Sequence, residues 1–386
     1  MGKGVKHELG QYFTTNYYLQ TSVSKLILNK PKRILEPSVG EGDLVLHVQN
    51  VLPEATKFDM YEIDRNLELH EEIRDLVTYG DFMDINIKRK YNTIIGNPPY
   101  VKTNHGNLYI DFIAKCFRLL ADKGELIFIV PSDFIKLTSA KDTINMMMDS
   151  GTFTHMVHPH DEKLFTNASI DVIVFRYCKD PSLPKNIILN GEDKYLINSD
   201  GILTFSSHSS ETTSCLKDYF NIYVGMVTGK ESVFKNSTYG NITILNDKNK
   251  VERYILMRQF PSENAELNEY MLSNKDELMA RKIKRFGEHN WYEWGALRNY
   301  TAIETYMGYQ CVYIKTLTRE KEVAFTDKVQ FFGGGLIMMV PKKKMSSEEM
   351  LKVVRHINSD DFKSNYTYSG RFKIGHRQLS NALFEF

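Results

Sequence analysis

The stretch YNTIIGNPPY, residues 91–100, decides how this chain is interpreted. Residues 91–96 form an apolar run that predicts a buried strand, and the tetrapeptide from Asn97 to Tyr100 follows it directly. An α/β sheet binds ligands at the carboxyl ends of its strands, so we expect the tetrapeptide at such a site. Its two prolines fix the backbone and remove two N–H donors, which leaves carbonyl acceptors beside the Asn97 side-chain oxygen. Two acceptors and a flat tyrosine ring suit a planar group with an exocyclic amine, such as a nucleobase or an amide.

Strand-like and helix-like segments alternate through the first half of the chain. The expected strands are residues 33–36, 57–63, 91–96, 126–130 and 170–177. Helical spacing or a charged amphipathic pattern predicts helices after Asp43, around 65–76 and over 108–120. Repeated strand–helix–strand units predict the α/β class with a doubly wound, Rossmann-like sheet.

The composition changes to proline, asparagine, glycine and serine around residues 181–210. We therefore predict two domains, residues 1–195 and residues 196–386. The second half loses the regular alternation and is expected to be mixed α+β.

Charge and cysteine content narrow the class of protein. Residues 1–200 carry a net charge of −4 and residues 201–386 a net charge of +5, which together give the +1 of the 386-residue chain. A basic second half favours a polyanionic partner. The four cysteines show no CxxC pairing, so we expect neither a metal site nor a disulfide framework. The sequence shows no signal peptide and no apolar run long enough to span a membrane. We therefore expect a cytoplasmic, nucleoid-associated protein, or one in the equivalent compartment of a virus-infected cell.

Three further features accompany Asn97. The loop from Glu36 to Gly42 follows the first strand, contains a G-x-G, and opens toward a helix N-terminus. Its acidic groups would repel a pyrophosphate, which favours a nucleoside with a cationic or zwitterionic tail. Glu62 ends the next strand and is placed to accept hydrogen bonds from ribose hydroxyls. Asp81 and Phe82 follow another expected strand and could bind the amine and the face of an adenine.

These features, in this order, resemble the gamma-class, TaqI-like DNA adenine-N6 methyltransferases that use S-adenosylmethionine. The family begins with a GQYFTP-like motif; here residues 10–15 read GQYFTT, with Thr15 in place of the usual proline. The resemblance covers residues 7–180 and is weaker at 224–229 and 371–375. It implies a catalytic methyltransferase domain over residues 1–195 and a DNA target recognition domain over residues 196–386.

The resemblance also implies roles for individual residues. It places Tyr12 and Thr14 at the methionine end of the cofactor, and Glu36, Pro37 and Gly40 in the loop around it. It assigns Glu62 to the ribose, Ile63 and Phe82 to the two faces of the adenine, and Asp81 to the adenine amine. Asn97 is expected beside the cofactor. It assigns catalysis on a flipped-out adenine to Asn97, Pro98, Tyr100 and Phe165, the last two stacking on opposite faces of the base. The basic residues expected to contact DNA are Arg371, Lys373 and Arg377.

Other functions share part of this pattern. Release-factor-type protein glutamine methyltransferases also carry NPPY, because a glutamine amide presents the same –NH2, and RNA amino-methyltransferases fit the charge. Cytosine-N4 enzymes more often carry Ser-Pro-Pro-Tyr, so adenine is preferred by resemblance alone. The sequence shows no nuclease motif such as PD…ExK, so we do not expect a combined restriction and methylation enzyme. We expect a modification enzyme that either has a separate cognate restriction endonuclease or acts as an orphan. A monomer is expected, because nothing in the sequence indicates dimerisation.

Overall fold

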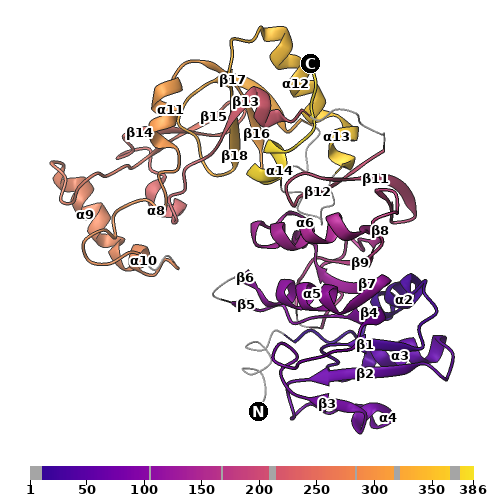
Figure 1. The fold of residues 1–386 in the computed structure, drawn as a ribbon. Coiled ribbons are helices and arrows are strands. Elements are labelled where there is room, and N and C mark those ends of the chain that lie inside the picture. The colour runs from indigo at the N-terminus through magenta and orange to yellow at the C-terminus, as the bar shows by residue number, and fades with distance from the viewer. Residues whose placement is uncertain are drawn as a thin grey trace. The chain divides into compact units, whose positions relative to one another are not determined.

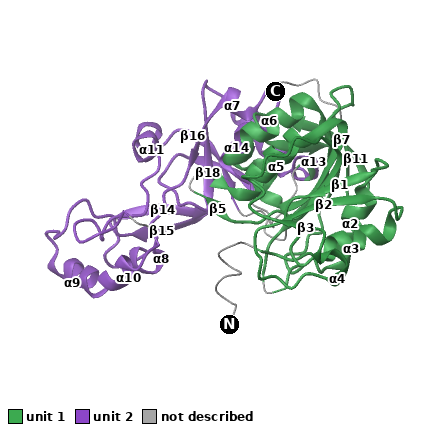
Figure 2. Ribbon diagram, turned by 60° about the horizontal axis from the view of Figure 1, so that its bottom comes forward, with its two compact units in different colours: residues 1–211, 364–370 green, residues 212–363, 371–386 purple. Residues whose placement is uncertain are grey.

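The computed structural model describes residues 11–103, 106–166, 168–207, 214–282, 285–316, 322–365 and 374–386 (Figure 1). The chain forms two compact units, each described by itself below (Figure 2). Unit 1 comprises residues 1–211 and 364–370, and unit 2 comprises residues 212–363 and 371–386.

A ten-stranded sheet with the order β12-β11-β10-β8-β9-β7-β4-β1-β2-β3 forms unit 1. The strands are β1 (Arg33–Glu36), β2 (Lys57–Glu62), β3 (Val77–Tyr79), β4 (Tyr91–Gly96), β7 (Leu120–Pro131), β8 (Thr152–Val157), β9 (Val172–Cys178), β10 (Asn186–Leu189), β11 (Glu192–Asn198) and β12 (Leu203–Ser206). The neighbours β7, β4, β1, β2 and β3 run parallel, whereas β9 lies antiparallel between β7 and β8. The carboxyl ends of the parallel strands therefore meet at one edge of the sheet.

Helices cover both faces of this sheet. They are α2 (Tyr17–Leu26), α3 (Asp43–Val51), α4 (Glu71–Arg74), α5 (Leu108–Leu119) and α6 (Lys141–Ser150), with the 3-10 turns η1 (Ser132–Lys136) and η2 (Thr138–Ala140) and the small hairpin β5 (Lys102–Thr103) and β6 (Gly106–Asn107). Successive side chains of β4 point to opposite faces. Ile94 packs in the core with α5 and α6, and Ile95 packs in the core with α2 and α3. The predicted doubly wound α/β class is confirmed.

The helix predicted around residues 65–76 is wrong for most of its length, because α4 covers only Glu71–Arg74. The Asp64 side chain accepts a hydrogen bond from the Asn66 backbone N–H at 2.9 Å, which closes a turn instead of a helix. The His70 N–H then donates to the Glu41 carbonyl at 3.2 Å, so this segment bonds to the β1–α3 loop.

Unit 1 extends beyond the domain boundary predicted after residue 195. That boundary falls inside β11, which pairs with both β10 and β12. Residues 181–207, which supply most of this polar composition, form these edge strands and the turns that join them, and they are not a linker. The compact unit accordingly continues to residue 211 and regains residues 364–370.

Unit 2 is mixed α+β, as predicted. Its antiparallel sheet has the order β13-β18-β16-β17, beside a separate β14–β15 hairpin. The strands are β13 (Phe220–Val224), β14 (Ile242–Asp247), β15 (Lys250–Tyr254), β16 (Gln310–Lys315), β17 (Ala324–Lys328) and β18 (Leu336–Pro341), and the helices are α7 (Leu216–Tyr219), α8 (Glu231–Phe234), α9 (Ala265–Ser273), α10 (Lys275–Met279), α11 (Tyr300–Tyr306), α12 (Ser347–Asn358), α13 (Asp360–Ser364) and α14 (His376–Ser380). In the described parts of the chain, no helix has the length and apolar character to cross a membrane. Those same parts hold no cluster of three or more His, Cys, Asp or Glu side chains suited to a metal ion.

Candidate active site

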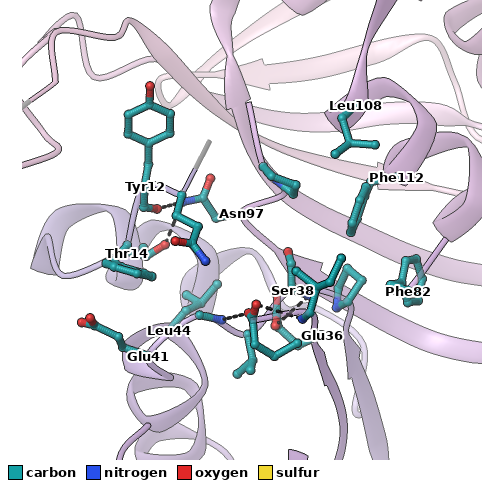
Figure 3. A pocket seen from close by; sticks show the side chains of 18 of the residues that line it. Tyr12, Thr14, Glu36, Ser38, Glu41, Leu44, Phe82, Asn97, Leu108 and Phe112 are labelled. Atoms are coloured by element: carbon teal, nitrogen blue, oxygen red, sulfur yellow. Dashed lines mark hydrogen bonds between the residues drawn. The ribbon is translucent and has the colours of Figure 1, made fainter. Parts of the chain in front are cut away.

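A pocket opens where β1, β2 and β4 end (Figure 3). These strands deliver Glu36, Glu62 and Asn97 to the same edge of the sheet, and the segment from Gln11 to Thr14 completes the lining. All ten residues that the sequence predicted for cofactor binding line this pocket, namely Tyr12, Thr14, Glu36, Pro37, Gly40, Glu62, Ile63, Asp81, Phe82 and Asn97. Their individual roles stay predictions.

The β1–α3 loop depends on glycine at two positions. Gly40 and Gly42 have φ angles of +61° and +105°, in the left-handed region that side chains disfavour. A Cβ atom on Gly42 would also lie 2.2 Å from the Ile73 Cδ1 atom. The Gly40 N–H donates to the Glu62 Oε2 atom at 2.9 Å, so the loop is tied to the end of β2.

Glu36 is a buried carboxyl group at the floor of the pocket. Its side chain accepts a hydrogen bond from the Ser38 N–H at 3.2 Å and is only 2% exposed. Gly96 makes room for it, because a Cβ at that position would lie 3.0 Å from the Glu36 Oε1 atom. Burial raises the pKa of Glu36 well above its usual value, and the nearby charge of Glu62 raises it further.

This raised pKa gives a prediction for stability against pH. The folded chain holds the Glu36 proton more tightly than the unfolded chain does. Its contribution to stability is therefore complete below the unfolded pKa of about 4.3 and is lost as pH rises through the folded pKa. Glu36→Gln cannot ionise, so we expect its free energy of unfolding to fall less than that of the wild type between about pH 5 and pH 8. Urea unfolding of both proteins across this range tests the prediction, and parallel curves would contradict it.

Glu62 and its neighbours shape the second wall. The two oxygens of Glu62 accept hydrogen bonds from the Gly40, Ile63 and Asp64 N–H groups, each at 2.9 Å. Ile63 exposes 52% of its surface at the pocket, where a bound ligand could cover it. Across from these groups, the buried Phe82 ring stacks on Phe112 at a centroid distance of 5.4 Å.

The side-chain amide of Asn97 has a fixed orientation. Its Nδ2 atom donates to the Tyr12 carbonyl at 2.6 Å and to the Thr14 hydroxyl at 3.1 Å. Its Oδ1 atom accepts a hydrogen bond from the Tyr100 hydroxyl at 2.5 Å. An amide oxygen has two lone pairs, so Oδ1 keeps the capacity to accept one more donor. Burial raises the pKa of Tyr100 well above its usual value, which keeps this phenol protonated and able to donate.

Tyr100 and Phe165 meet in an aromatic cluster that also contains Tyr12. Tyr12 stacks on Tyr100 with ring centroids 5.3 Å apart and an interplanar angle of 28°. Phe165 is 4% exposed and meets Tyr100 edge-on, at 6.3 Å and 81°. The rings of Tyr100 and Phe165 thus touch each other in this structure, and the face of Tyr100 is covered by Tyr12. Pro98, Tyr100 and Phe165 all lie outside the pocket lining, and Pro98 is buried.

The predicted DNA-contacting residues belong to unit 2. Arg371 and Lys373 lie outside the described residues. Arg377 is half-buried in α14, where its carbonyl accepts a hydrogen bond from the Asn381 N–H at 3.1 Å. Their proposed contacts with DNA stay predictions.

Sequence reasoning missed several residues of the pocket. The sequence placed Asp43 only at the start of a helix, and Leu108 and Phe112 only within the helix expected over residues 108–120, yet all three line the pocket. With these included, the lining holds five carboxyl side chains, Glu36, Glu41, Asp43, Glu62 and Asp81, and none of the described lining residues is a lysine, arginine or histidine. The expectation that the site repels phosphate groups gains support from this one-sided charge.

Comparison with known proteins identifies the class of domain. Residues 24–165 match the Eco57I restriction-modification methylase family. This part of the chain is a restriction-modification methylase domain of the Eco57I type.

Individual relatives fit this assignment. The Type II methyltransferase M.HincII of Haemophilus influenzae is 29% identical over 224 residues, which make up 52% of this chain and 43% of that protein. The Type II methyltransferase M.CvrRI of Paramecium bursaria Chlorella virus XZ-6E is 24% identical over 262 residues, 64% of this chain and 69% of that protein. The chain thus spans less than half the length of M.HincII.

One solved structure shares the fold over most of the chain. The Type IIL restriction-modification enzyme MmeI, solved in complex with DNA, aligns with a TM-score of 0.58 and 10% identity. The alignment covers 97% of this chain and 68% of MmeI. At this identity the likeness concerns the fold.

Proposed function

We propose that this protein is a DNA methyltransferase that transfers a methyl group from S-adenosylmethionine to the N6 amine of an adenine in duplex DNA. The observation that carries the proposal is the oriented Asn97 amide, whose Oδ1 atom is held at the border of an acidic pocket built from the ends of β1, β2 and β4. The relatives named above, which are Type II methyltransferases, support the reaction class.

The pocket fits the proposed cofactor in charge and shape. S-adenosylmethionine carries a sulfonium and an ammonium group and no phosphate, which suits a lining of five carboxyl groups. Glu62 would hold the ribose, Asp81 the adenine amine, and Ile63 and Phe82 the two adenine faces. When bound, the cofactor supplies an electrophilic methyl group. Glu36 would face its cationic part, and ionisation of this buried carboxyl would be favoured by the ligand's charge.

The chain's own contribution to the reaction is to activate the amine. The lone pair of an adenine amine is delocalised into the ring, so the nitrogen is a poor nucleophile. Asn97 Oδ1 and the Pro98 carbonyl would accept its two N–H groups, which localises the lone pair and aims it at the methyl group. Positioning and electrostatics then lower the barrier. The surplus proton would leave to solvent after transfer.

The target base must leave the duplex to reach Asn97. Tyr100 and Phe165 would offset the lost stacking, at roughly 1–3 kcal/mol per base. Because Tyr12 now covers the Tyr100 face, the base would have to displace the Tyr12 ring. Unit 2, with Arg371, Lys373 and Arg377, would supply contacts to the duplex. The fold shared with MmeI, which was solved in complex with DNA, supports DNA as the partner.

Two substitutions of Tyr100 separate stacking from hydrogen bonding. Tyr100→Ala removes the ring, and we expect the affinity for DNA containing a flipped base to fall by about 1–3 kcal/mol. Tyr100→Phe keeps the ring and loses only the hydroxyl that donates to Asn97, so we expect near wild-type DNA affinity with a lower transfer rate. DNA titration and single-turnover transfer measure the two effects. Equal losses of affinity in both variants would contradict a stacking role.

The proposed function is tested by methyl transfer from labelled S-adenosylmethionine to unmethylated duplex DNA. The modified nucleoside is identified after digestion, and RNA and the release-factor glutamine peptide are offered in parallel. N6-methyladenine in DNA supports the proposal, and N4-methylcytosine corrects the base. Label only in RNA or peptide would overturn the substrate assignment and favour an RNA or a protein glutamine methyltransferase, respectively.

A further inference from the structure

A chain of hydrogen bonds joins the two ends of the loop that carries Phe165. His158 directly follows β8 and Asp171 directly precedes β9, and their Nε2 and Oδ1 atoms are 2.8 Å apart. The other carboxylate oxygen of Asp171 accepts a hydrogen bond from the Ser132 hydroxyl. The Ser132 N–H also donates to the Asp171 carbonyl at 3.0 Å. Ser132 begins η1 directly after β7, so three strand ends are joined at one point.

The His158 end of the loop is held from a second side. Its N–H donates to the Asn190 Oδ1 atom at 2.7 Å, and the Asn190 Nδ2 atom donates back to the His158 carbonyl at 3.1 Å. The His158 residue is only 2% exposed. A polar pair buried in this way is strongly favoured to stay bonded, because breaking it would leave unsatisfied groups away from water.

The same end of β7 also holds the opposite aromatic ring. The Tyr100 hydroxyl lies 3.1 Å from the Ile129 carbonyl, three residues before Ser132. Ile129 and Ser132 therefore connect the Tyr100 ring and the Phe165 loop to one strand end. The spacing between the two rings depends on both connections.

The loop is also braced internally. The Ile170 N–H donates to the Glu162 carbonyl at 2.9 Å, and the Ser169 hydroxyl donates to the Glu162 carboxylate at 3.1 Å. Phe165 packs with the core between the sheet and helices α2 and α3. Because the loop is held by these internal contacts, we expect a displacement of its ends to move the Phe165 side chain.

From this arrangement we propose that His158, Asp171 and Ser132 are positioning residues for the target base, acting through Phe165. None of them needs to contact the base or the cofactor. The three side chains set where the Phe165 ring stands relative to Tyr100, and hence whether an extruded base is gripped between them. This inference rests on the proposed function and deepens it.

A double-mutant cycle tests the inference. The methylated position in the duplex is mapped first, and 2-aminopurine then replaces the base at that position, so that its extrusion raises the fluorescence. We expect Phe165→Ala to weaken the extruded-base complex about tenfold and Asp171→Ala about three- to tenfold. The double variant should match Phe165→Ala within about twofold, because Asp171 acts through the ring that is already missing. Cofactor affinity should stay within about twofold of the wild type in all of them.

Control variants test whether the effect on base extrusion is specific to Asp171. Asp133→Ala removes a neighbouring carboxylate of η1 that pairs with Lys136 at 2.9 Å and is 61% exposed, and it should leave base extrusion unchanged. If Asp171→Ala does not fold, Ser132→Ala takes its place in the cycle, since it removes only the hydroxyl–carboxylate hydrogen bond and keeps the one between the two backbones. Additive losses in the double variant, or an unaltered signal in the single one, would overturn the positioning role. A wild type that methylates DNA while the cycle is additive defeats this inference alone. A wild type that transfers no methyl group to DNA defeats the proposed function with it.

Discussion

Asn97→Ala is expected to lower the rate of methyl transfer by roughly 10²–10³-fold, the loss typical when one preorganised polar group is removed from a reaction centre. The substitution deletes the Oδ1 acceptor proposed to bind the adenine amine. It also deletes the Nδ2 donor that holds the Tyr12 carbonyl and the Thr14 hydroxyl. Single-turnover transfer at saturating cofactor and DNA measures the chemical step.

The two parts of this loss can be separated. Thr14→Val removes one partner of the Nδ2 atom and leaves Oδ1 in place, so we expect a rate within about tenfold of the wild type. Cofactor titration is needed for both variants, because Asn97 and Thr14 line the pocket. Turnover of Asn97→Ala near the wild-type rate, with cofactor bound, would remove Asn97 from the mechanism.

The second large effect concerns stability. Glu125→Ala is expected to lower the free energy of unfolding by about 3–5 kcal/mol, because it leaves a buried arginine without its counter-charge. Glu125 is fully buried on β7 and accepts a hydrogen bond from the Arg176 Nε atom at 2.8 Å. It also accepts from the Thr93 hydroxyl at 2.9 Å and the Leu28 N–H at 3.1 Å, so β4 and the segment that follows α2 lose an anchor as well. Urea unfolding gives the difference directly.

An exposed ion pair in unit 1 supplies the control. Lys141 and Asp200 are 2.7 Å apart, with side chains 38% and 50% exposed. Exposed pairs of this kind contribute about 0–1 kcal/mol, so Asp200→Asn should change stability little. If both substitutions shift the unfolding midpoint equally, the buried network does not stabilise the sheet as argued.

The sequence was sufficient to place the site at the sheet edge. Parallel strands present their carboxyl ends together, so three polar residues at the ends of expected strands, Glu36, Glu62 and Asn97, had to converge. The class of the sheet followed from the same alternation. These inferences needed only local patterns and one topological rule.

The contacts that orient the site were not accessible in this way. The stacking of Tyr12 on Tyr100 joins residues far apart in the chain, and no periodic pattern encodes it. His158 and Asp171 lie at the two ends of one loop, where neither residue type nor spacing signals a pair. The failed helix around 65–76 has a similar cause, since the Glu41 carbonyl redirects a segment whose own spacing is helical.

The space that Gly96 leaves for Glu36 has a consequence for protein engineering. Positions 36 and 96 lie on the paired strands β1 and β4. Their side chains would compete for the same space, because the Glu36 Oε1 atom would lie only 3.0 Å from a Cβ on residue 96. A Cβ there would also lie 3.1 Å from the Phe128 Cε1 atom and 3.3 Å from the Pro37 Cδ atom, so a side chain at residue 96 needs these neighbours to shift by a few tenths of an ångström. A shorter acid or a small polar residue at 36 would remove the closest of these contacts, so a library should vary position 36 together with residue 96 and Phe128.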